Sequence, residues 1–178
     1  MKRSSISLAY HEAGHAVVAI AEGLHVESVS IRRGAEELSD SKSFFVYGYH
    51  FRNGQEQKMI ARSCILGMLA GLAAEKLYSP ETSEPSSQDD FNQAFELSRK
   101  FAVLPRSARC IGDDAHMAYL KRLQNEAARL VRKNWTAVVA VAETLLEKKT
   151  VNAEELESLF TWATAAVLNH RSSDRSAA

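Results

Sequence analysis

Residues 8–21 constrain the fold most, because they predict a helix that is apolar on nearly every side and yet contains three strongly polar side chains. Helices of that composition are buried, and an unpaired polar group is costly in a protein interior. The apolar positions include Leu8, Val17, Val18, Ile20 and Ala21. The three polar side chains are His11, Glu12 and His15, and a buried helix needs a specific reason to carry them.

These three residues form the pattern H-E-x-x-H, which places two imidazoles one helical turn apart on the same face. Neutral imidazole is a good zinc ligand, and two of them leave room for a third ligand and a water. Glu12 can reach that water, take its proton and return it to a leaving amine. The pattern therefore indicates Zn²⁺ as cofactor, His11 and His15 as ligands, and Glu12 as the general base of peptide hydrolysis.

The third ligand is not identified by the pattern itself. The metzincin arrangement would place a histidine six residues after His15, where this chain has Ala21. Carboxylates at the start of a helix also complement the helix dipole, so an acidic pair there has a purely structural explanation. Physical reasoning leaves four candidates open: Glu75, Asp89, Asp90 and Glu96.

Several stretches of the chain resemble the peptidase domain of the FtsH-type proteases, which are ATP-dependent zinc endopeptidases. Residues 9–17 are similar to the motif helix of that family. Residues 70–77 resemble its small-residue stretch followed by an acidic pair, with Lys76 in place of the second acid. Residues 89–94 are similar to the Asn-Asp segment whose aspartate completes the zinc site.

The resemblance implies that Asp90 is the third ligand. Asp89 stands where the family has asparagine, and it is the alternative ligand. Zinc sites usually also require a carboxylate behind a zinc-bound histidine to orient its ring. Glu75 is a candidate for that role, and so is Asp89 where Asp90 is the ligand.

The closing segment, from Asn134-Trp135 to residues 150–156, again resembles the family. We therefore expect a mainly α-helical, zincin-like metalloprotease domain with a small β-sheet beside the active site. At 178 residues, of which 46% are hydrophobic, the chain is long enough for one well-buried domain. We assign that domain to residues 1–168 and a flexible tail to residues 169–178.

Periodicity and turn residues predict the elements of this domain. Serines at positions 4, 5 and 7 offer caps for the first helix, and Gly23 is its natural stop. Strands are expected at 26–33 and 43–51, and further helices at 55–78, 89–103, 113–133, 134–148 and 152–168. The second strand, including Phe45, Val46, Tyr47 and Gly48, is a candidate edge to which an extended peptide substrate would add by main-chain hydrogen bonds.

Composition argues against several partners. A formal net charge of +0 gives no basic footprint for nucleic acid. The longest apolar run, between Arg62 and Glu75, is far shorter than the ~20 residues of a membrane helix. Two cysteines without metal-type spacing and the lack of a secretory leader favour a cytoplasmic protein. No G-x-x-x-x-G-K-[ST] sequence occurs, so the resemblance concerns the peptidase domain alone.

The function predicted from these features is zinc-dependent cleavage of unfolded or flexible polypeptides. The family resemblance implies a separate ATPase as partner and a homo-oligomer, in that family a hexamer. The alternative is a zinc-stabilised module that binds peptides or proteins without cutting them. Glu12 favours the enzyme, because a purely structural zinc site needs no base at that position.

Overall fold

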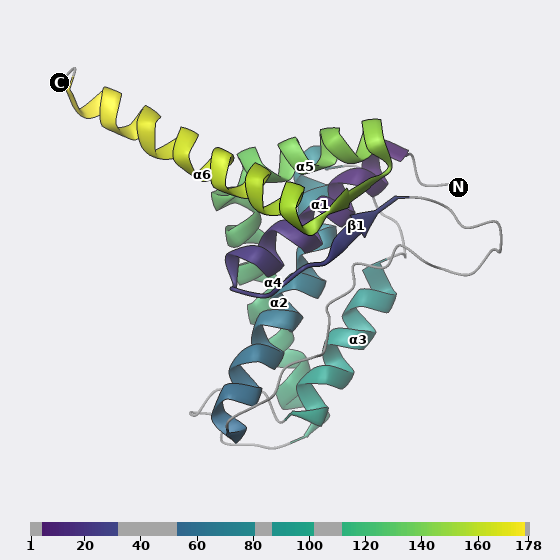
Figure 1. Cartoon of the computed structure of the whole chain (residues 1–178). Coiled ribbons are helices and arrows are strands. Elements are labelled where there is room, and N and C mark those ends of the chain that lie inside the picture. Colours follow the sequence, from purple (N-terminus) through teal and green to yellow (C-terminus); the bar gives the residue numbers. More distant parts are fainter. Residues whose placement is uncertain (1–4, 32–52, 81–86, 102–111, 177–178) are drawn as a thin grey trace.

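The computed structural model describes residues 5–31, 53–80, 87–101 and 112–176, and it confirms a mainly helical fold with a small antiparallel sheet (Figure 1). The helices are α1 (Ser5–Ala21), α2 (Gly54–Tyr78), α3 (Ser87–Lys100), α4 (Asp113–Lys133), α5 (Trp135–Lys148) and α6 (Ala153–Ser176). The two strands are β1 (Ser28–Ser30) and β2 (Thr150–Asn152).

Helix α1 lies at the centre of the molecule, as its apolar composition predicts. It packs against α2 and α5 and also contacts α4 and α6. Every residue from Ala9 to Ala19 is buried, including the three polar side chains of the motif. The side chains of the H-E-x-x-H pattern are therefore inside the protein, where only specific partners can stabilise them.

Small residues bring α1 and α2 unusually close together. A β-carbon added at Gly14 would lie 2.6 Å from the β-carbon of Ala74 and 2.8 Å from the carbonyl oxygen of Ala70. One helix turn away, α2 passes the two histidines at Gly71, where an added β-carbon would lie 2.5 Å from His15 Nε2. The close packing of α2 against the motif helix therefore depends on Gly71 of α2 and on Gly14 of α1.

The end of α1 is a Schellman motif built on Gly23. This glycine has a φ of 79°, its N–H donates to the carbonyl of Ile20, and the N–H of Leu24 donates to the carbonyl of Ala19. The chain then turns into β1, which pairs antiparallel with β2 with Val29 opposite Val151. Both valines are fully buried, so the sheet closes one side of the core.

Several boundaries match the prediction and others do not. The Asn53 side chain caps α2, and α4 spans the predicted residues. Strand β1 is shorter than expected. Strand β2 was not predicted, because three residues are too few to show the alternation of apolar and polar side chains that marks a strand. The expected end of the last helix near Leu168 is wrong: α6 continues to Ser176, since residues 169–176 contain no proline or glycine to stop it.

The predicted strand at 43–51, with Phe45, Val46, Tyr47 and Gly48, lies outside the described residues. Its role as an edge for substrate therefore remains a prediction.

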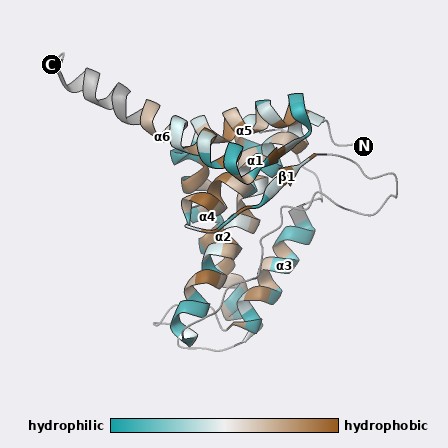
Figure 2. Cartoon of the chain, viewed as in Figure 1, coloured by the Kyte–Doolittle hydropathy of each residue, from teal (hydrophilic) through white to brown (hydrophobic). Residues whose placement is uncertain are grey.

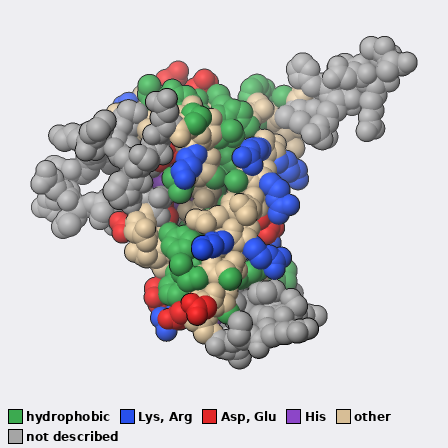
Figure 3. All heavy atoms as spheres, turned by 180° about the vertical axis from the view of Figure 1, so that it is seen from behind, with side chains coloured by type: hydrophobic (Ala, Val, Ile, Leu, Met, Phe, Trp, Pro, Cys, Tyr) green, Lys and Arg blue, Asp and Glu red, His purple; other side chains and the backbone are tan. Residues whose placement is uncertain are grey.

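The outer helices are amphipathic, and their polar sides form the surface of the molecule. Figure 2 shows hydrophobic and hydrophilic residues alternating along α3 and α4. On α4 the exposed positions include five basic residues, and Figure 3 shows Lys and Arg side chains in a band on the rear face. The five exposed basic residues of α4 are Lys121, Arg122, Arg129, Arg132 and Lys133. Within the described part of the chain, no helix has the combination of length and apolarity that crossing a membrane requires.

The close crossing of α1 and α2 gives a first prediction. Gly14→Ala should lower the free energy of unfolding by roughly 1–3 kcal/mol, because the new methyl group meets backbone of α2 that cannot move without separating the helices. Gly54→Ala is the matched control: a β-carbon there meets nothing within 4 Å, so stability should be unchanged or slightly higher. Urea denaturation of both variants measures the difference, and equal midpoints would contradict the crossing.

Candidate metal centre

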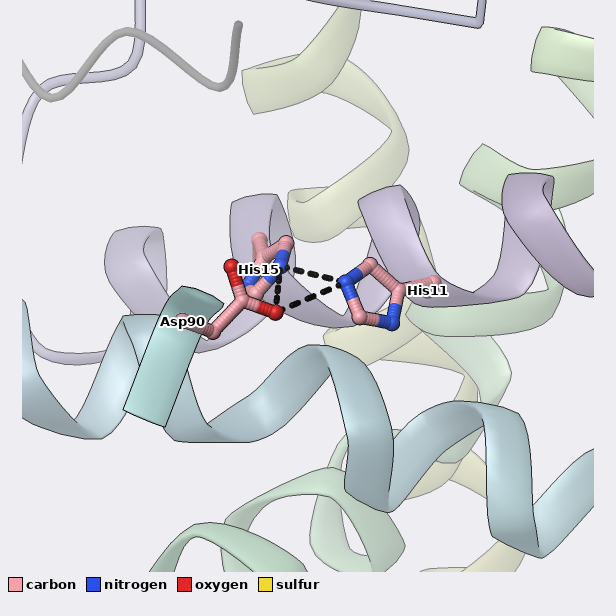
Figure 4. A group of neighbouring side chains, drawn as sticks. All are labelled: His11, His15 and Asp90. Carbon is pink, nitrogen blue, oxygen red and sulfur yellow. Dashed lines mark hydrogen bonds and ion pairs between the residues drawn. The ribbon is translucent and has the colours of Figure 1, made fainter. Parts of the chain in front are cut away.

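Three side chains from two separate helices converge beside α2. His11 and His15 come from successive turns of α1, and their Nε2 atoms are 2.9 Å apart. Asp90 comes from the first turn of α3, and its Oδ2 lies 3.0 Å from His11 Nε2 and 3.5 Å from His15 Nε2. Figure 4 shows the three side chains pointing toward one another. Among the described residues they form a His-His-Asp group that could hold a metal ion.

The dimensions of this group fit zinc. Tetrahedral zinc with bonds of about 2.0–2.1 Å separates its ligand atoms by about 3.3–3.4 Å, close to the observed distances. Asp90 Oδ2 is a buried atom that accepts no hydrogen bond within the described structure, although both imidazoles approach it. Buried carboxylate oxygens normally have a partner, so this oxygen is suited to a cation.

Gly71 supplies the space beside the ligand atoms. A β-carbon at this position would lie 2.5 Å from His15 Nε2 and 2.8 Å from His11 Nε2, which is closer than any β-carbon normally comes to another atom and only somewhat longer than a zinc–nitrogen bond of about 2.0–2.1 Å. Any side chain here would therefore compete with an ion for the same volume.

Helix α2 also orients both imidazole rings. His15 Nδ1 donates to the carbonyl oxygen of Gly67 at 2.8 Å. His11 Nδ1 donates to Glu75 Oε2 at 3.2 Å. When the δ nitrogen carries the hydrogen, the ε nitrogen of a neutral imidazole presents its lone pair, so both rings direct a donor atom at the same point.

The charge states of Asp90 and of the histidines beside it depend on one another. Burial raises the pKa of Asp90, but contacts with His11 and His15 lower it more, so the pKa lies well below its usual range. Burial lowers the pKa of His15, but the contact with Asp90 and the charge of Glu12 outweigh this and raise it to about 9. In the absence of metal, a proton on His15 therefore compensates the Asp90 carboxylate at neutral pH.

The other predicted residues fall into distinct places. Asp89 is exposed and outside the group, because neighbouring helical residues point about 100° apart and only one of the pair can face α1. Glu96 is exposed and pairs with Arg99. Glu75 is 1% exposed and touches the back of His11 rather than the site of convergence. Glu12 is 2% exposed on α1, directly after His11.

Two contributors were not anticipated. The Gly67 carbonyl could not be assigned from sequence, because a backbone group acts here and any residue carries one. Ser7 was expected to be a helix cap, but it lies within α1 and its hydroxyl donates to Glu75 Oε1. Its spacing of four residues from His11 was the available signal, since residues i and i+4 share a helix face.

Fold and site together define a mainly helical domain in which the two buried histidines of an H-E-x-x-H helix meet an aspartate from another helix. No family profile matches the sequence. The sequence is similar to the ATP-dependent zinc metalloprotease FtsH of Thermus thermophilus, with 27% identity over 181 aligned positions. That alignment covers 84% of this chain but only 28% of the relative, so the chain spans little more than a quarter of its length. The likeness supports a distant relation to FtsH.

Gly71→Ala tests the space for the ion. The added methyl group should weaken zinc binding by at least about tenfold, because it enters the volume beside both Nε2 atoms. Gly54→Ala, on the same helix but with open space around its β-carbon, should bind zinc like the unaltered protein. Competition with a chelating dye gives both dissociation constants. Equal constants would show that zinc does not bind at this position.

The raised pKa of His15 predicts how zinc binding depends on pH. Up to about pH 9 the metal-free protein holds a proton that zinc must displace, so affinity should rise about tenfold per pH unit from 6.5 and level off near 9. The same proton stabilises the metal-free fold: this contribution is complete below pH 6.5 and is lost as pH rises through about 9.

Calorimetric titration at about pH 7.5 in two buffers of different ionisation enthalpy measures the released protons directly. We expect about one proton to be released for each zinc ion that binds, because zinc displaces the proton held by His15. If zinc binding released no proton and zinc affinity did not change between pH 6.5 and about 9, a proton shared between His15 and Asp90 in the metal-free protein would be contradicted.

Proposed function

We propose that this chain is a zinc-dependent endopeptidase that cleaves flexible or unfolded polypeptides. The observation that carries the proposal is the arrival of Asp90, from α3, at the two ε nitrogens of the H-E-x-x-H helix. Two imidazoles and one carboxylate leave an open position on a four-coordinate ion, which is the arrangement of catalytic rather than structural zinc sites.

In the proposed reaction His11, His15 and Asp90 hold the ion. Bound zinc would supply Lewis acidity, which polarises a peptide carbonyl and makes a water more acidic. Glu12 accepts a proton from the attacking water and later donates it to the nitrogen of the departing amine. Glu75 and the Gly67 carbonyl keep the two imidazoles in the orientation that binding requires.

The similarity to FtsH supports zinc and peptide hydrolysis as the chemistry. The relative is ATP-dependent by name, and this chain aligns with 28% of it. As the family resemblance implies, we propose that folded substrates reach the site only with the help of a separate ATPase, and that flexible polypeptides do not need one. Assembly of several copies into a ring, as expected from the family resemblance, and a cytoplasmic location belong to the same proposal.

Glu12→Gln tests the enzyme against a non-cleaving binding module. With zinc and fluorescently labelled casein as the unfolded substrate, the substitution should lower cleavage by about a hundredfold to ten-thousandfold, because no base remains to move the proton. Bound zinc, measured by metal analysis, should stay the same, since Glu12 is not a ligand. Glu96→Gln, at an exposed carboxylate of α3, is the matched control and should cleave normally.

Equal absence of cleavage by the zinc-loaded protein and by Glu12→Gln would contradict the enzyme. If casein or a peptide nevertheless bound to both, the zinc-stabilised binding module would be the better description.

A further inference from the structure

The carboxylate of Glu75 connects two residues of α1 that lie one helical turn apart. Its Oε2 accepts from His11 Nδ1 at 3.2 Å, and its Oε1 accepts from the Ser7 hydroxyl. All three side chains are buried, with 7% of Ser7, 3% of His11 and 1% of Glu75 exposed. Ser7 thus reaches the metal centre indirectly, through a residue of another helix.

The planarity of the carboxylate makes the two contacts interdependent. The last torsion of a glutamate side chain has broad, weakly defined preferences, so the plane of the carboxylate is set by its hydrogen bonds rather than by the torsion itself. A donor on Oε1 restricts that rotation and thereby fixes where Oε2 lies. Because Ser7 and His11 are four residues apart on one rigid helix, the same element positions both ends of the contact.

We propose that Ser7 is a positioning residue of the metal centre, which holds the Glu75 carboxylate in the plane that orients His11 toward the ion. This inference rests on the proposal that zinc binds His11, His15 and Asp90, but it does not depend on peptide cleavage. Partners that orient metal-binding histidines typically change metal affinity about 10–100-fold when lost. One further step away, Ser7 contributes about tenfold, at the lower end of that range.

A purely structural role would make a different prediction. If the Ser7–Glu75 hydrogen bond only joins α1 to α2, its loss destabilises the metal-free and zinc-bound proteins equally. Zinc affinity then stays the same, because affinity reports the difference between those two states.

The experiment compares Ser7→Thr with Ser7→Val, which have nearly the same shape but differ in the hydroxyl group. Ser7→Thr should bind zinc like the unaltered protein, and Ser7→Val about tenfold more weakly in chelator competition at about pH 7.5. Cobalt(II) provides a second readout: its visible absorption bands should shift in Ser7→Val and not in Ser7→Thr, since they report ligand orientation. Equal zinc affinities and equal cobalt spectra would overturn the proposal.

A double-mutant cycle tests whether Ser7 acts through Glu75. In a Glu75→Met background, which keeps the side-chain length but removes both oxygens, the difference between Ser7→Thr and Ser7→Val should disappear. A tenfold difference that persisted there would also overturn the proposal. Should Ser7→Val not fold by circular dichroism, Ser7→Ala gives the same comparison without a branched side chain.

These measurements separate the two proposals. Tight zinc binding that depends on the Ser7 hydroxyl, in a protein that cleaves no casein, would leave the positioning role intact and remove the peptidase. Absence of any zinc binding by the unaltered protein would remove both.

Discussion

The close crossing of α1 and α2 is the constraint on which the remaining structure depends. A helix buried on all sides cannot carry two imidazoles and a glutamate unless a neighbour satisfies them. Gly14 and Gly71 let α2 approach closely enough to do so, and its Gly67 carbonyl and Glu75 carboxylate accept from the two δ nitrogens. Tight packing and the orientation of the ligands are therefore one feature: the same contact that closes the core aims both rings.

The metal centre also depends on a third helix, α3, whose first turn supplies the carboxylate. Asp90 brings a negative charge beside the two buried imidazoles, and in the metal-free state a proton on His15 balances it. The cluster is thus organised around a positively charged centre, which either a proton or a divalent ion can provide. This competition links the electrostatics of the fold to its proposed chemistry, because the proton that stabilises the metal-free site must leave before the ion binds.

The structure shows how far local patterns predicted this fold. Helix α4 was predicted to the residue, since its apolar stripe and flanking residues agree. Asn152 caps α6 by accepting from the N–H of Glu155, whose own side chain pairs with Lys148 at 2.5 Å. Strand β2 and the long continuation of α6 were missed, because a three-residue strand exists only through its partner and a polar sequence without breakers does not mark a helix end.

The sequence by itself determined the buried motif helix, the spacing of His11, Glu12 and His15, and the chemistry these residue types can perform. The family resemblance implied Asp90 as the third ligand, but only the tertiary structure shows which carboxylate meets the two imidazoles. Four acids were candidates along the chain, and the fold brings Asp90 to the imidazoles, turns Asp89 to solvent and places Glu75 behind His11. The physical reason is the distance along the sequence. Helical periodicity relates only residues within a few turns of one helix, whereas Asp90 meets His11 through the packing of α3 against α2 and of α2 against α1.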